Sequence, residues 1–188
     1  MSKFAAVINQ AKATAVDMTV AQKGGGGGEY TPPEAGPTLV RMVGYIELGK
    51  HESEYKGQKK TRPEVAMVFE LLGKRHPPVE IDGVKYPQRI TIREGLSLNE
   101  KARFFKLFGI MNWQGKATHM AELLLAPFAA TVVHREYVAN GEKRVAAELY
   151  DRAAGSYTVR PARTPVIDQE TGEETGEYRS IAVPAAIG

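Results

Sequence analysis

Residues 40–72 read VRMVGYIELGKHESEYKGQKKTRPEVAMVFELL, two apolar stretches on either side of a long polar one. In residues 39–48 apolar and polar side chains alternate, which predicts a half-buried strand. The expected inward face carries Val40, Met42, Ile46 and Leu48, and the expected outward face carries Arg41, Tyr45 and Glu47. Residues 65–72 are almost uniformly apolar and predict a strand buried on both faces. Residues 49–62 are expected to form a loop, and loops longer than about 12 residues inside a compact domain are often functional.

The rest of the chain predicts two hairpins with a helical region between them. Asp82-Gly83 lies within residues 77–92 and Asn140-Gly141 lies between residues 128–137 and 143–150, and such dipeptides are strong hairpin signals. The sequence SLNE at 97–100 resembles a capping box that opens a helix with Leu98, Ala102, Phe105 and Phe108 on its apolar stripe. A second short helix is predicted over residues 118–127. Phe69, Phe105 and Phe108 are assigned to the core.

This order of elements predicts a mainly β fold. Five strands with a helix between the third and the fourth are the arrangement of the OB-fold, a partly open five-stranded β-barrel. An SH3-like barrel and an open α+β sheet remain as alternatives. The OB-type barrel is expected to occupy residues 38–163.

The two ends of the chain differ from this domain in composition. Residues 1–37 predict an N-terminal arm, with an amphipathic pattern early on and a flexible linker that includes five glycines at 24–28. Residues 164–188 carry one arginine against five carboxylates and predict an acidic, disordered tail. Residues 41–163 carry 21 Lys and Arg against 14 Asp and Glu. A basic body with an acidic tail is typical of proteins that handle nucleic acid.

Composition also limits the compartment. The chain has no cysteine, which excludes disulfides and thiolate zinc sites. It lacks both an apolar run of about 20 residues and the apolar core of a signal peptide. We therefore expect a cytoplasmic protein without membrane contact, in the host cytoplasm if it is phage-encoded.

No pattern of catalytic residues stands out. His51, Glu52 and Glu54 lack the helical spacing of a metal site, and the sequence has neither a nucleophile elbow nor a thiol. His119 is expected to be a surface or capping residue, and His134 a structural one. The prediction is a protein that is not an enzyme and that needs no metal or cofactor.

Basic and aromatic side chains, in contrast, recur on the predicted strands and loops. A protein that binds single strands needs cations for the phosphates and aromatic faces for the bases. The candidate nucleic-acid-binding residues are Arg41, Tyr45, Lys50, Tyr55, Lys56, Lys59, Lys60, Arg62, Lys74, Arg75, Tyr86, Arg89, Arg93, Trp113, Arg135, Tyr137, Lys143, Arg144 and Tyr150.

With these residues in place, the chain resembles phage-encoded single-stranded DNA-binding proteins of the OB-fold type. The similar stretches are VGYIELG followed by EYKGQKK, then VAMVFELL, and finally APFAATVVHREYVANGEKRVAAELYD, within residues 38–151. The resemblance implies sequence-tolerant coating of single strands in phage replication or recombination, without a cofactor. The N-terminal arm departs from a minimal domain of this kind.

The leading hypothesis is therefore a single-stranded DNA-binding protein, with RNA binding and homo-oligomer formation left open. The acidic tail is expected to contact replication or recombination proteins. One alternative is a virion or assembly module that acts through protein–protein contacts. Another is an accessory subunit of a nucleic-acid enzyme.

Overall fold

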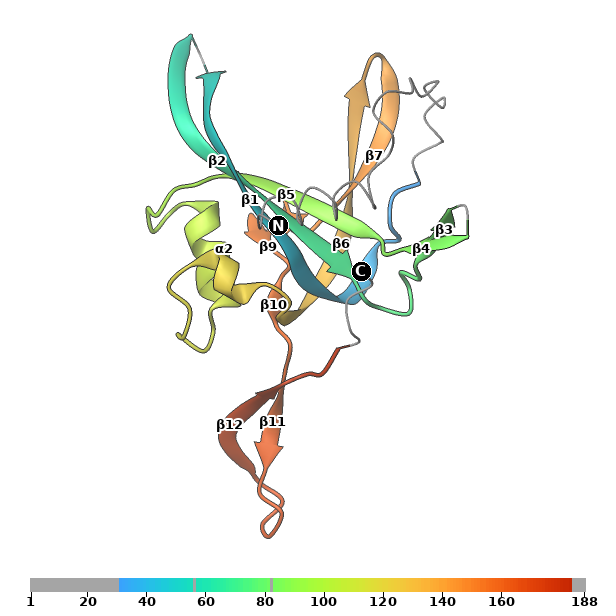
Figure 1. Ribbon diagram of the computed structural model, residues 1–188, viewed down its shortest axis with the longest axis vertical. Helices are drawn as coiled ribbons and strands as arrows, with labels where there is room; N and C mark the ends of the chain where they lie inside the picture. Colours follow the sequence, from blue (N-terminus) through green and yellow to red (C-terminus); the bar gives the residue numbers. More distant parts are fainter. Residues whose placement is uncertain (1–30, 56, 82, 184–188) are drawn as a thin grey trace, which may run out of the picture. The chain divides into compact units, whose positions relative to one another are not determined.

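One long strand, β1 (Gly36–Tyr55), organises the main sheet. Its first residues pair with β6 (Pro127–Ala139), and its residues from Val40 onward pair with β2 (Gln58–Leu71). The strand order is β10-β6-β1-β2-β5, and β7 also pairs with β6 (Figure 1). The ladder of β1 with β2 has irregularities between Met42 and Gly44 and between Glu47 and Gly49, and such bulges bend a strand.

The computed structural model describes residues 31–55, 57–81 and 83–183, without the side chains of Ser53 and Tyr55. Contacts divide the chain into two units, 1–31 and 32–188. Most of the predicted N-terminal arm, with its five glycines, lies outside the described residues, as do residues 184–188. The remaining elements are β3 (Val79–Ile81), β4 (Val84–Tyr86), β5 (Arg89–Gly95), α2 (Arg103–Met111), the 3-10 helix η1 (Met120–Leu123), β7 (Glu142–Glu148), β8 (Tyr150–Asp151), β9 (Ser156–Tyr157), β10 (Arg160–Pro161), β11 (Arg163–Ile167) and β12 (Glu174–Ser180).

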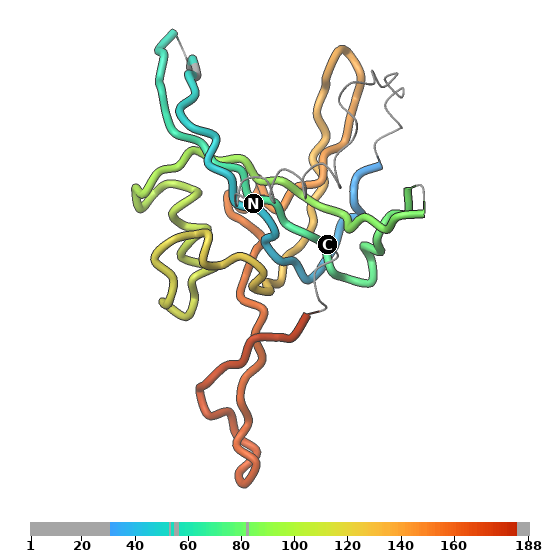
Figure 2. The backbone as a smooth tube through the Cα atoms, in the orientation of Figure 1, coloured from blue at the N-terminus to red at the C-terminus, as the bar shows by residue number. Residues whose placement is uncertain are grey.

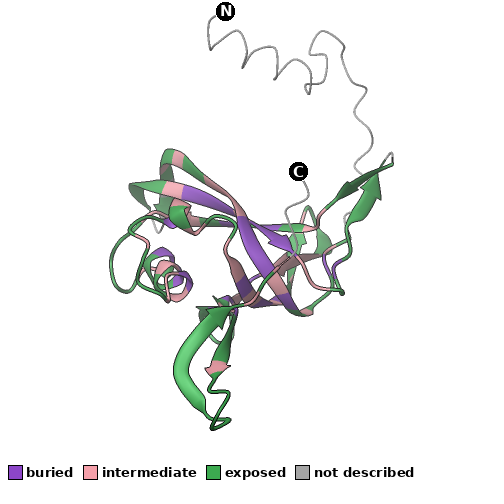
Figure 3. Cartoon of the chain, turned by 60° about the horizontal axis from the view of Figure 1, so that its bottom comes forward, coloured by how far each residue is buried: buried purple, intermediate pink, exposed green. Residues whose placement is uncertain are grey.

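The core lies on one face of the main sheet, where α2 covers it. Phe69, Phe128 and Met67 from the strands are almost fully buried, and Phe104 and Leu107 of α2 pack against the same cluster (Figure 3). The mainly β fold and the core position of Phe69 are thus confirmed.

Three sequence predictions about the strands hold. Asp82-Gly83 joins β3 to β4, and Asn140-Gly141 joins β6 to β7 with positive φ at both residues of the second turn. The strand predicted at 65–72 is buried on both faces: Phe69 is buried toward the core, and Ala66 and Glu70 are buried on the opposite side.

The prediction of a long loop at 49–62 is wrong. β1 and β2 continue through this segment as an antiparallel ladder that brings Tyr55 opposite Gln58 (Figure 2). Gly57 in the turn has φ +73°, the conformation that a two-residue hairpin turn requires. Because both faces of this ladder are polar, its sequence lacks the apolar alternation that marks a half-buried strand.

The predicted faces of the first strand are partly wrong as well. Val40 and Met42 face the core as expected, but Ile46 is 51% exposed and Tyr45 packs against the core. The irregularity after Met42 adds one residue to the strand, so the side chains from Gly44 to Glu47 change face, and the second irregularity after Glu47 changes the face again.

Helix boundaries and the C-terminal segment also differ from prediction. The SLNE capping box does not form: Ser97 Oγ accepts a hydrogen bond from the Asn99 amide at 3.4 Å, and α2 begins at Arg103. Phe104 and Leu107 therefore form the buried stripe, and Phe105 is 39% exposed. The second helix is the short η1, where the His119 ring accepts a hydrogen bond from the Ala121 amide, so the capping role is confirmed.

The disorder predicted for residues 164–188 is wrong for the described part. β11 and β12 form an antiparallel hairpin, and its turn is closed by Asp168 Oδ1, which accepts hydrogen bonds from the amides of Glu170 and Thr171. Acidic composition predicted disorder, but this local Asx-type turn and strand alternation specify a hairpin instead.

In the described residues the main sheet is not closed into a barrel, because β5 and β7 share no ladder. Side-chain contacts instead connect the end of β5 to β9 and to α2. The Tyr157 hydroxyl donates a hydrogen bond to Glu94 Oε1 at 2.5 Å, and Arg103 Nε lies 3.1 Å from the same oxygen. Burial, reinforced by Glu94, raises the pKa of Tyr157 strongly, so its hydroxyl stays protonated and remains a donor.

Candidate nucleic-acid interface

The outer half of the β1–β2 hairpin is a two-stranded arm rich in cations. Lys50, Lys59, Lys60 and Arg62 are all exposed on it. Because opposed residues of an antiparallel pair share a face, Lys60 and Arg62 lie on one face and Lys50 and Lys59 on the other. Lys56 and the side chain of Tyr55 lie outside the described residues. The face of Lys50 and Lys59 also carries Glu52 and Glu54, so the excess of positive charge lies on the face of Lys60 and Arg62.

The face of Lys60 and Arg62 continues onto the main sheet, on the side opposite the core. Arg89, Thr91 and Arg93 of β5 are exposed there, while the alternating Ile90 and Ile92 are buried in the core. We call the outward side chains of Lys60, Arg62, Arg89, Thr91 and Arg93 the β2–β5 face. It joins the predicted cations of the β1–β2 hairpin to those of β5.

Glu64 links the two strands of this face. Its carboxylate lies 2.7 Å from Arg93 Nε and 3.5 Å from Arg62 Nε. The hydrogen bond from Arg93, which outweighs desolvation, lowers the pKa of Glu64, so the carboxylate stays ionised at neutral pH. Glu64 therefore holds two guanidinium groups side by side, although as an exposed pair it adds little stability.

The β6–β7 hairpin carries a second basic and aromatic cluster. Arg135 lies over the Tyr137 ring at 4.9 Å from its centroid, and its Nε is 2.5 Å from Glu148 Oε1. Tyr137 is directly opposite Arg144, whereas Lys143 is opposite Val138 on the other face. Glu148 also contacts Arg152. Burial of Glu148 raises the pKa of its carboxyl group, but Arg135 and Arg152 outweigh burial, so the pKa is lowered. The ring of Tyr137 is thus held at the surface by a fixed cation.

Figure 1 shows the β1–β2 and β6–β7 hairpins extending from the main sheet toward the same side. The structure therefore collects eleven of the predicted residues on these two hairpins and on β5, and their described side chains are exposed or partly exposed. They are Lys50, Tyr55, Lys59, Lys60, Arg62, Arg135, Tyr137, Lys143 and Arg144 on the hairpins, joined by Arg89 and Arg93 on β5.

Two predicted residues of β1 are not exposed on the β2–β5 face. Arg41 is 3% exposed, and its Nε lies 2.5 Å from Glu70 Oε2, where Glu70 is equally buried. Tyr45 faces the core side and donates a hydrogen bond to Glu47; its burial, then Glu47, raise its pKa to about 12. The predicted outward position is therefore wrong for Tyr45. Arg41 is buried in an ion pair with Glu70.

Three other predicted residues lie away from the hairpin arms. Lys74 and Arg75 follow β2 at the end of the strand opposite the β1–β2 turn, and Arg75 pairs with Glu34. Tyr86 belongs to the short β3–β4 hairpin, where it is 49% exposed. These positions do not extend the β2–β5 face.

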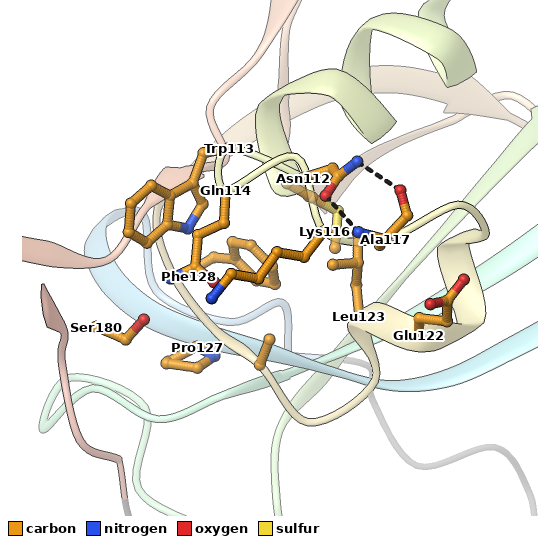
Figure 4. Close-up of a pocket in the computed structure, with 12 residues that line it drawn as sticks. Asn112, Trp113, Gln114, Lys116, Ala117, Glu122, Leu123, Pro127, Phe128 and Ser180 are labelled. Atoms are coloured by element: carbon orange, nitrogen blue, oxygen red, sulfur yellow. Dashed lines mark hydrogen bonds between the residues drawn. The ribbon is translucent and has the colours of Figure 1, made fainter. Parts of the chain in front are cut away.

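Tyr150 and Trp113 are engaged in contacts of their own. Tyr150 packs edge-on against Tyr157, and Arg103 lies 5.0 Å above its ring. Trp113 lines a hollow of about 250 Å³ together with Lys116 and Phe128 (Figure 4). Arg163, at the start of β11, lies 5.4 Å from the Trp113 ring centroid. Neither ring belongs to the two hairpin arms.

Sequence reasoning missed the exposed Ile46 and Thr91 and the partly buried Glu64 on the side of the sheet opposite the core. The bulge after Met42 places Ile46 on the outward face, and no sequence pattern predicts this bulge. Thr91 lies between Arg89 and Arg93 at the strand period of two, and this spacing is a signal that could have found it. Glu64 could be recognised only from the register that brings Arg93 near it.

Among the described residues, no three His, Asp or Glu side chains gather as metal ligands would. No helix in that part of the chain is long and apolar enough to cross a membrane. Comparison with protein-family models, with curated proteins and with solved structures gave no match.

Proposed function

We propose that this chain binds single-stranded DNA through the β2–β5 face and the β1–β2 and β6–β7 hairpins. The observation that carries the proposal is the β2–β5 face, which presents four exposed cations, two of which, Arg62 and Arg93, pair with Glu64. Phosphates of an extended strand would lie along these cations. The Tyr137 ring, held by Arg135, offers a stacking surface for a base.

The pairing of strands supports an OB-type interpretation of the fold. β1, β2, β5, β6 and β7 occur in that order with α2 between β5 and β6, and β1 pairs with both β2 and β6. In OB-folds the face of the second and third strands and the hairpin loops 1–2 and 4–5 bind oligonucleotides. On this interpretation the β2–β5 face and the two hairpins would be the binding surface, and the sheet would be a barrel left open between β5 and β7.

Sequence tolerance follows from the kind of groups on this surface. Guanidinium and ammonium groups contact phosphates, which carry no sequence information. Together with the resemblance to phage single-stranded DNA-binding proteins, this supports a protein that coats strands during replication or recombination in the cytoplasm, without catalysis or cofactor. RNA offers the same phosphates and base faces and is a second ligand to test.

The β11–β12 hairpin supports a separate protein contact. Residues 163–183 contain five carboxylates and two arginines, and Figure 1 shows this hairpin on the opposite side of the sheet from the two hairpin arms. Replication or recombination proteins could therefore bind the acidic hairpin while the arms hold a strand.

The test is fluorescence anisotropy of a labelled oligo-dT at two salt concentrations, with a duplex of the same length as control. We expect binding to the single strand that weakens steeply as salt rises, because bound phosphates release counterions. No binding at low salt, or a preference for the duplex, would refute the proposal. Oligo-U in the same assay decides whether RNA is bound as well.

A further inference from the structure

The β3–β4 hairpin has one apolar and one charged face. Val79 is opposite Tyr86 and Ile81 is opposite Val84, so these four side chains share one face. They are 49%, 49%, 55% and 52% exposed, respectively. Glu80 and Lys85, opposite each other, occupy the other face. A two-stranded hairpin is marginally stable by itself, and exposed apolar side chains gathered on one face mark an interaction site.

A second unpartnered apolar surface lies beside α2. A hollow of about 230 Å³ is lined mostly by apolar side chains. Its lining includes Tyr45, Leu96, Leu98, Phe104, Phe108 and Met120. Leu98 at its border is 73% exposed. An apolar cavity of about 150 Å³ already accepts benzene, so this hollow has room for an aromatic or a large aliphatic side chain.

These two surfaces cannot meet within one molecule. Figure 1 shows the β3–β4 hairpin and α2 on opposite sides of the main sheet. We propose that the apolar face of the β3–β4 hairpin of one copy packs into the apolar hollow beside α2 of a second copy. The side chains that enter the hollow would come from Ile81 and Tyr86, and the charged face of the hairpin would stay in solvent.

The geometry of this contact fixes the kind of assembly. The two surfaces differ, so the contact is head-to-tail, and a pair of copies keeps one free hairpin and one free hollow. Such contacts build closed rings or open rows, and in an open row all copies point the same way. A single DNA strand has one polarity, so a row of this kind suits it, whereas a two-fold symmetric pair would present opposite polarities.

The size of the hairpin face makes the contact weak. Four half-exposed side chains offer roughly 300–400 Å² per copy, below the about 800 Å² per partner of a standard stable interface. We therefore expect monomers in dilute solution. Copies bound next to each other on one strand have a high effective concentration, and the contact forms there. This contact would make binding to long strands cooperative, and that consequence rests on the function proposed above. The contact between copies does not depend on that function.

Cysteine cross-linking tests the contact directly, because the chain has no cysteine of its own. Concentrated full-length Ile81→Cys chain is mixed with Leu98→Cys chain and oxidised mildly. The matched control replaces Ile81→Cys by Glu80→Cys, on the charged face of the same strand. We expect the 81–98 disulfide dimer to exceed the 80–98 dimer clearly. Equal yields for both pairs, or an 81–81 disulfide as the main product, would overturn the proposal.

The strand-dependent consequence is measured with Ile81→Ser, a surface change that leaves the β2–β5 face intact. Its affinity for an oligo-dT that holds one copy should equal that of the parent chain, while its affinity for a long oligo-dT should fall. Unchanged affinity for the long strand would overturn the role in cooperative binding. If neither chain binds any oligonucleotide, the proposed function fails, and the cross-link alone decides the contact between copies.

Discussion

Removal of three cations from the β2–β5 face should weaken single-strand binding by an amount that can be calculated. In the variant Lys60→Ala, Arg62→Ala, Arg89→Ala, all three changes fall on one exposed face. Each phosphate contact on a single strand contributes about 0.7 to the slope of log affinity against log salt. Three lost contacts lower the magnitude of this slope by about 2. If the variant and the parent chain have equal affinity at 1 M salt, the variant therefore binds about 100-fold more weakly at 0.1 M salt.

The matched control removes the same charge elsewhere. Lys85, Lys106 and Lys116 are exposed on the charged side of the β3–β4 hairpin, on α2 and beside Trp113. Anisotropy titrations of oligo-dT at several salt concentrations compare the two triple-alanine variants. Equal losses in both would show that net charge and not the β2–β5 face controls binding, and no loss in the first variant would refute the assignment of the face. Folding is checked by urea unfolding, because Arg62→Ala also removes the Arg62–Glu64 ion pair.

Three further predictions concern stacking, the buried ion pair and alkaline pH. Tyr137→Ala should weaken oligo-dT binding by about 1–3 kcal/mol, whereas Tyr137→Phe, which keeps the ring, should bind almost normally; equal losses would exclude base stacking. Glu70→Ala leaves Arg41 buried without its carboxylate and should lower the free energy of unfolding in urea by about 3–5 kcal/mol, while the double change Arg41→Met, Glu70→Leu should recover most of it. Burial and Glu47 raise the pKa of Tyr45 to about 12, so its contribution to stability is fully present below the unfolded pKa near 10 and is lost as pH rises from there toward 12. Unfolding of Tyr45→Phe followed across this pH range should show a smaller alkaline loss, and an identical loss would contradict the assignment.

The sequence predicts the fold where local chemistry decides it. Asp82-Gly83 and Asn140-Gly141 predict their hairpins because the turn conformation depends on the two residues themselves. The almost uniformly apolar run at 65–72 predicts a strand buried on both faces, because nearly all of its own side chains avoid water. The same kind of reasoning fails for residues 49–62, because a ladder solvated on both faces has no apolar pattern.

The candidate site is less accessible to prediction, because it depends on register. A single bulge after Met42 moves Tyr45 to the core side and Ile46 to the outer side. The pairing of Glu64 with Arg93, and that of Arg41 with Glu70, follow from which strands are neighbours. Lysine and arginine positions can be read from the sequence, but which of them share a surface is decided by contacts between residues about 30 positions apart.

The most direct test of the central claim locates the bound strand on the protein. An oligo-dT with 5-iodouracil substitutions is cross-linked by ultraviolet light to the full chain, and the attached residues are identified by mass spectrometry. We expect attachment at Tyr137 and along the β1–β2 hairpin and β5. Attachment confined to Trp113 or Tyr86, away from these elements, would contradict the account.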